Sequence, residues 1–150
     1  TGWKVGWAYG PARLISAVRV VRQHLSFVSG GPFQYAIAHG LGMPDQYFTE
    51  FRRDLSAKRD LLSGGLTELG LRVIPSQGTY FLTTDVRPLG FNDGAEFCAK
   101  IAERCRVVAI PFQTLCDNPD VGKPYVRWAF CKRPEVLEQA LTRLEQGMNP

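Results

Sequence analysis

Two basic residues of this 150-residue chain stand in strand-like sequence that could present them to an anion. Lys4 lies between Trp3 and Trp7 in a stretch of alternating side chains. Arg127 lies in Tyr125–Phe130, where strand alternation puts it on the face opposite the large apolar residues. An ammonium group gives a phosphate a point charge, and a guanidinium matches a carboxylate with a planar pair of donors. On pattern alone, a solvated cation beside a strand is the simpler interpretation of each.

The composition argues against several other classes of function. The net charge is +4, and the basic residues are interleaved with acidic ones, so we expect no nucleic-acid partner. The four cysteines form no C-x-x-C pair and neither histidine is near them, so we expect no metal site. Unpaired cysteines favour a reducing, cytoplasmic setting. No apolar run approaches the roughly 18 residues of a membrane span, so we expect no membrane partner.

The first half of the chain predicts a short strand followed by helices. The strand covers residues 3–9, and a helix with one apolar face follows from about 12 to 24. The helix predicted at 33–41 is small and apolar nearly all round, which suits burial in a larger body. A long amphipathic helix begins at Asp45 and ends at a C-terminal glycine cap, with a plausible kink at its internal glycine pair.

The chain after Gly70 predicts a different architecture, with shorter elements in the order β-β-α-β-β-α. We expect strands at 71–74, 79–86, 107–110 and 125–131, and helices at 93–104 and from about 134 to 147. A small sheet with helices packed on one face would bury the apolar side chains of such a series. The predicted fold of this region is therefore α+β.

Several segments resemble one enzyme family. Thr1–Trp7 resembles the T-G-W-[KR]-x-G-W segment of class I/II, fold-type I, pyridoxal-phosphate (PLP) aminotransferases. Val126–Cys131 resembles their [VIL]-R-[FILW]-x-F-[AC] strand. The resemblance implies that Lys4 binds the PLP phosphate and that Arg127 binds the α-carboxylate of the amino-acid or 2-oxo-acid substrate.

Two further turns extend this resemblance. Pro75–Leu82 is similar to the family's P-x-G-[GTS]-[YF]-F turn, in which we expect Gly78 to have a positive φ or to permit a close approach. The aromatic residues Tyr80 and Phe81 are candidates to border the substrate. Val108–Pro111 is similar to the V-x-x-[IV]-P-G strand and turn, but Phe112 stands where glycine is usual.

The resemblance also implies a domain organisation. Within an α/β parent fold, residues 1–44 would be the tail of the large PLP-binding domain, 45–70 an interdomain helix and 71–150 the small C-terminal domain. The Schiff-base lysine of the S-x-[SG]-K motif is expected upstream of Thr1, so no catalytic residue is assigned here. The parent would be a homodimer, and this chain could pair with a missing N-terminal half.

The function implied is PLP-dependent transfer of an amino group between an amino acid and a 2-oxo acid. The nearest likeness is to the kynurenine, methionine and N-succinyldiaminopimelate aminotransferase branch. A PLP-dependent C–S β-lyase, which releases pyruvate and ammonia, is the alternative enzyme on the same fold. A further alternative is a non-catalytic C-terminal fragment that only folds or associates, and we expect the chain alone to be inactive.

Overall fold

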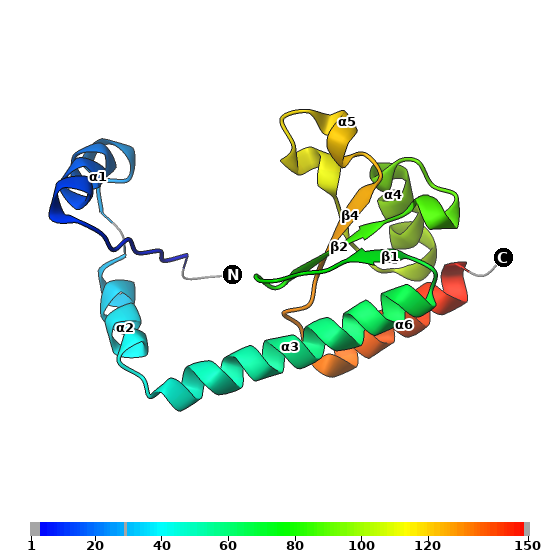
Figure 1. Cartoon of the computed structure of the whole chain (residues 1–150), viewed down its shortest axis with the longest axis horizontal. Helices are drawn as coiled ribbons and strands as arrows, with labels where there is room; N and C mark the ends of the chain where they lie inside the picture. The colour runs from blue at the N-terminus through cyan, green and yellow to red at the C-terminus, as the bar shows by residue number, and fades with distance from the viewer. Residues whose placement is uncertain (1–3, 29, 149–150) are drawn as a thin grey trace. The chain divides into compact units, whose positions relative to one another are not determined.

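The computed structural model describes residues 4–28 and 30–148, which form two compact parts. One part extends to Phe48 and the other begins at Thr49, within the long helix α3 (Asp45–Glu68). Figure 1 colours the chain from its N-terminus to its C-terminus and labels the elements of both parts. Residues 1–3 of the T-G-W-K motif and Ser29 lie outside the described residues.

The first part contains the helices α1 (Ala12–Leu25) and α2 (Gly31–Leu41), close to the predicted bounds. The strand predicted at 3–9 is wrong for residues 4–9, which have no regular structure. Alternation alone does not make a strand, because the backbone groups of a strand need a paired neighbour. Among the described residues up to Phe48, none is buried, although α1 has the predicted apolar face.

The second part contains a sheet of four antiparallel strands in the order β1-β2-β4-β3. The strands are β1 (Arg72–Ile74), β2 (Phe81–Asp85), β3 (Ile110–Pro111) and β4 (Tyr125–Ala129). The α-helices besides α3 are α4 (Gly94–Cys105), α5 (Pro119–Gly122) and α6 (Pro134–Met148), and the 3-10 helices are η1 (Arg87–Leu89) and η2 (Phe112–Leu115).

This series confirms the predicted β-β-α-β-β-α order, with the three short helical segments as additions. Of the strands in this second part, the third was predicted least accurately. Val107 and Ala109 are buried, as a strand pattern requires, but only Ile110 and Pro111 pair with β4. Burial of alternate side chains therefore does not by itself bring a backbone into the sheet.

One face of the sheet packs on the helices. Leu82 pairs with Trp128 and Thr84 pairs with Val126, and all four side chains are buried. They form one core with buried residues of the α-helices, chiefly Leu62, Leu66, Phe97, Ile101, Leu137 and Leu144. The Trp128 Nε1–H donates to the Thr84 hydroxyl at 2.8 Å, which satisfies a polar pair inside this core.

Helix α3 crosses its glycine pair as a single helix, and the two glycines differ in their surroundings. A β carbon at Gly65 would collide with the Leu141 side chain of α6, whereas one at Gly64 would meet nothing within 4 Å. Gly65 thus permits a close approach of the two helices. Glycine destabilises a helix relative to alanine, but at position 65 the close packing of α6 leaves no room for a larger side chain.

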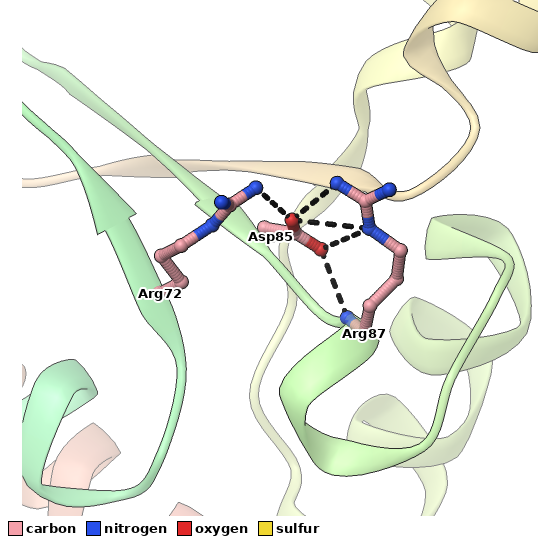
Figure 2. Close-up of polar contacts among 3 residues, drawn as sticks. All are labelled: Arg72, Asp85 and Arg87. Carbon is pink, nitrogen blue, oxygen red and sulfur yellow. Dashed lines mark hydrogen bonds and ion pairs between the residues drawn. The ribbon is translucent and has the colours of Figure 1, made fainter.

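A buried carboxylate joins β1, β2 and η1, as Figure 2 shows. The Asp85 side chain is only 2% exposed and is ion-paired with both Arg72 and Arg87. Arg87 donates from Nη2 at 2.7 Å and from its backbone N–H at 2.9 Å. The Arg87 side-chain hydrogen bond is the main cause that lowers the pKa of Asp85 to about 2, against the opposing effect of burial.

Candidate functional site

Strand β4 presents Arg127 on the face of the sheet opposite the core. Its neighbours in sequence, Val126 and Trp128, are buried, whereas Arg127 is half-buried. Arg127 pairs with Thr83 of β2 on one side and with Ile110 of β3 on the other. The arginine therefore lies in the interior of the sheet rather than at its edge, which the sequence pattern alone did not establish.

The Arg127 side chain lines a cavity of about 280 Å³. The other lining residues are neutral: Ile74, Pro75, Ser76, Thr79, Phe81, Thr83 and Phe112. The guanidinium carbon lies 4.1 Å from the centroid of the Phe81 ring, in a cation–π contact. The buried Nε of Arg127 has no hydrogen-bond partner, and among the described residues the guanidinium makes no ion pair. An unneutralised arginine in a neutral cavity is suited to a carboxylate ligand.

The turn before β2 forms one wall of this cavity, and its conformation differs from the prediction. Gly78 has neither a positive φ nor any neighbouring atom within 4 Å of an added β carbon, so that prediction is wrong. The left-handed residue is Thr79, with φ of 64°. The Thr79 hydroxyl accepts from the Phe81 N–H at 3.2 Å, and the Ser76 hydroxyl donates to the Gly78 carbonyl at 2.9 Å. These local hydrogen bonds support a conformation that is strained for a β-branched residue.

Phe112 is a lining residue whose role the sequence did not reveal. It begins η2 directly after β3, and its ring meets the Tyr125 ring edge-on at 6.5 Å. The departure from glycine at this position was visible in the sequence. Only the pairing of Ile110 with Arg127 shows why it matters, because that pairing brings the residues after β3 beside the arginine. Of the two aromatic candidates, Phe81 lines the cavity and Tyr80 does not.

Lys4, the second predicted site residue, is exposed and has a φ of 47°. A positive φ at a residue other than glycine is uncommon and occurs often at binding and active sites. Its exposure is also what the simpler interpretation, a solvated lysine, predicts, so the phosphate contact implied by the resemblance stays a prediction. Lys4 belongs to the first compact part and Arg127 to the second, and each site is described within its own part.

The described residues also bear on metal sites, membrane spans and cysteine chemistry. Residues 4–28 and 30–148 contain no group of three or more His, Cys, Asp or Glu side chains that could hold a metal ion. Within the same ranges, none of the helices combines the length and the apolar character that crossing a membrane requires. The four cysteines are unpaired, and burial raises the pKa of Cys98 to about 12, so its thiol stays protonated at neutral pH.

Comparison with known proteins gives consistent matches along the chain. The family model for aminotransferase class I and II matches residues 1–144. A probable N-succinyldiaminopimelate aminotransferase of Mycobacterium tuberculosis is 48% identical over 96% of this chain. A methionine aminotransferase of Escherichia coli is 35% identical over 97% of it. The chain spans 38% of the length of each of these relatives.

Solved structures agree with the sequence matches. The structure of N-succinyldiaminopimelate aminotransferase from M. tuberculosis superposes with a TM-score of 0.88 and 50% identity, covering 97% of this chain and 38% of that one. The E. coli protein with methionine aminotransferase function gives 0.85 and 34%, with the same coverage. The family and these homologues use PLP. The chain therefore belongs to the aminotransferase class I and II family.

Proposed function

We propose that this chain supplies the substrate-carboxylate site and one phosphate contact of a PLP-dependent aminotransferase. The enzyme would transfer an amino group between an amino acid and a 2-oxo acid. The observation that carries the proposal is Arg127, an unneutralised guanidinium in a cavity whose other lining residues are neutral. Bound PLP supplies the electron sink for the reaction, while the protein binds and orients the reactants.

Arg127 suits both halves of an amino transfer. Amino acids and 2-oxo acids each carry a carboxylate next to the carbon that changes, so one cation can hold either. A guanidinium remains charged at any working pH and offers a planar set of donors. Lys4 would neutralise part of the phosphate charge, which fixes the cofactor without entering the chemistry.

The substrate specificity is proposed only as a class. The named relatives act on N-succinyldiaminopimelate and methionine, and a further relative is kynurenine–oxoglutarate transaminase 3 of Mus musculus, 31% identical over 93% of this chain and 35% of its own length. We propose an amino-acid donor, a 2-oxo-acid acceptor and a cytoplasmic homodimer as the working form. We also propose that residues 1–150 alone do not catalyse the transfer, because the resemblance assigns the Schiff-base lysine to other sequence.

Carboxylate binding tests the role of Arg127 directly. The chain is titrated with pyruvate and followed by NMR, in the unchanged form and with Arg127→Ala, Arg127→Lys and Arg143→Ala. We expect Arg127→Ala to weaken binding at least about tenfold and Arg127→Lys to weaken it less, because lysine keeps the charge but loses the planar fork. Arg143, an exposed cation of α6, is the matched control and should have no effect. Equal affinity after Arg127→Ala would overturn the assignment.

Phosphate binding tests Lys4 separately. Pyridoxine 5′-phosphate is the ligand, because it lacks the aldehyde that reacts with any lysine. We expect weaker binding for Lys4→Ala and unchanged binding for Lys100→Ala, which removes another exposed lysine. Identical affinities of these two variants would reject the role of Lys4.

An activity assay separates the remaining alternatives. The chain is incubated with PLP, 2-oxoglutarate and cystathionine or methionine. We expect no turnover by the chain alone. Glutamate formation would contradict this expectation, and release of pyruvate and ammonia without need for the 2-oxo acid would favour the C–S β-lyase.

A further inference from the structure

We propose that Phe81 is a positioning residue that holds the Arg127 guanidinium so that a carboxylate meets its two terminal nitrogens end-on. This inference rests on the proposed role of Arg127 in binding a carboxylate. It concerns a different residue and a different property, the orientation of the guanidinium rather than its charge.

Burial limits which nitrogens of Arg127 a ligand can reach. Nε of Arg127 is buried and has no hydrogen-bond partner. A ligand oxygen therefore cannot pair with Nε unless the side chain moves, and the side-on geometry that uses Nε and one terminal nitrogen is closed. The two terminal nitrogens are then the side-chain donors that remain for a ligand in the cavity that Arg127 lines. They can bind both oxygens of one carboxylate.

An aromatic contact, rather than a polar partner, restricts the guanidinium of Arg127. Among the described residues it makes no ion pair or hydrogen bond, so polar partners do not orient it. The centroid of the Phe81 ring lies 4.1 Å from the guanidinium carbon, and this cation–π contact holds the group against β2. A free arginine side chain has many rotamers, so a partner that restricts it before binding lowers the entropy that ligand binding must remove.

The register of β2 and β4 gives the Phe81 ring room beside Arg127. Phe81 pairs across the sheet with Ala129, and Thr83 pairs with Arg127, so Phe81 and Arg127 are diagonal neighbours on one face. Because Ala129 has only a methyl group, the aromatic ring has room to extend over the next position of β4. Phe112 lies at the same cavity and is itself held against Tyr125. The cavity that holds the guanidinium is thus lined by aromatic residues from β2 and η2.

Phe81 can be changed without removing the core. It is half-buried on the face of the sheet that carries Arg127, and it lies outside the buried cluster to which the adjacent Leu82 belongs. A change in ligand binding can therefore be separated from loss of the fold. Phe81→Tyr keeps an aromatic ring at the same position and is the matched control, whereas a change at Tyr80 would disturb Phe81, because the two ring centroids lie 4.4 Å apart.

The test uses the whole chain with Phe81→Leu, Phe81→Tyr and Arg127→Ala. The first readout is the NMR shift of the Arg127 Nε–H proton without ligand, which an aromatic ring stacked on the guanidinium displaces. We expect Phe81→Leu to move this signal and Phe81→Tyr to leave it near its original position. An unmoved signal in Phe81→Leu would show that the ring does not orient the guanidinium and would overturn the inference.

The second readout is the affinity for pyruvate. We expect Phe81→Leu to weaken binding about 2- to 5-fold, the size of an exposed cation–π contact, and Phe81→Tyr to restore it. Unchanged affinity in Phe81→Leu, with a loss in Arg127→Ala, would reject Phe81 as a positioning residue while leaving the proposed function intact. If Arg127→Ala binds as well as the unchanged chain, the proposed function fails and this inference fails with it.

Discussion

The two compact parts of the chain contain similar helices but differ in what those helices bury. In the first part, no described residue is buried, and Leu25 of α1 is 82% exposed. In the second part, apolar residues of α3, α4 and α6 close on the sheet, and Leu66 is fully buried. An apolar helical face therefore predicts a tendency to be buried, and in the second part the sheet and the other helices satisfy it. The stability of the chain should reside in the second part.

The largest difference in stability is expected when one leucine is shortened in each part. Leu66→Ala should destabilise the chain by about 2–5 kcal/mol, because it removes a buried side chain and leaves a cavity. Leu25→Ala, the matched change at an exposed position, should alter stability by no more than about 0.5 kcal/mol. Urea denaturation followed by circular dichroism measures both.

Similar losses of stability in these two variants would contradict the expected difference between the two parts. They would show that α1 is packed in solution in a way that its exposed face does not indicate. A loss of stability only in Leu66→Ala would assign the cooperatively unfolding unit to residues 49–148.

The next largest loss of stability is expected at Gly94, where α4 closely approaches β4. A β carbon at Gly94, the first residue of α4, would lie 2.5 Å from the Tyr125 carbonyl oxygen. Gly94→Ala should cost about 1–3 kcal/mol, because backbone must move to admit it. Gly64→Ala should instead stabilise the chain by roughly 0.5–1 kcal/mol, since the site is open and alanine favours a helix. Thermal unfolding of both variants checks the opposite signs.

A smaller effect, which depends on pH, is expected at Asp85. Its pKa in the folded chain is about 2, below the ordinary value of 3.8, so the ionised carboxylate stabilises the fold at pH values above 3.8. This contribution is lost as the pH falls through about 2. Asp85→Asn should therefore cost about 1–2 kcal/mol at pH 7, and the difference from the unchanged chain should shrink between pH 4 and pH 2.

The control for this prediction is Asp54→Asn, which breaks an exposed pair with Lys58 on α3. That change should cost well under 1 kcal/mol at either pH, because solvent screens the pair. Urea midpoints measured at pH 7 and pH 2.5 distinguish the two carboxylates. A constant difference for Asp85→Asn across this range would show that its ion pairs do not stabilise the fold.

The fold of the second part was predictable because its signals are local. Alternation and helical period each depend on a few adjacent residues, and α4 begins at an equally local contact, in which the Asp93 carboxylate accepts from the Ala95 N–H at 2.7 Å. The first strand was predicted wrongly for the complementary reason. The alternation at residues 4–9 is also local, but strand formation depends on a distant partner that local pattern does not reveal.

The candidate site was predictable in its residue types and not in its geometry. Sequence motifs selected Lys4 and Arg127, and their roles stay predictions. The stack of Phe81 on Arg127 follows from strand register, which brings β2 beside β4. The positive φ at Thr79 rather than Gly78 follows from hydrogen bonds within the turn. Register and turn conformation are outcomes of packing, so composition does not fix them.

The pairing of β2 with β4 also has a consequence for folding kinetics. Thr84 and Trp128, hydrogen-bonded across these strands, are 44 residues apart in sequence. Closing so long a loop costs chain entropy before any contact compensates for it, so this pairing should form late. Phe81 and Arg127 meet only when the two strands align. Partly folded forms, even with α3 and α4 complete, should therefore have no carboxylate site, and affinity for the ligand should appear together with the central strand pair.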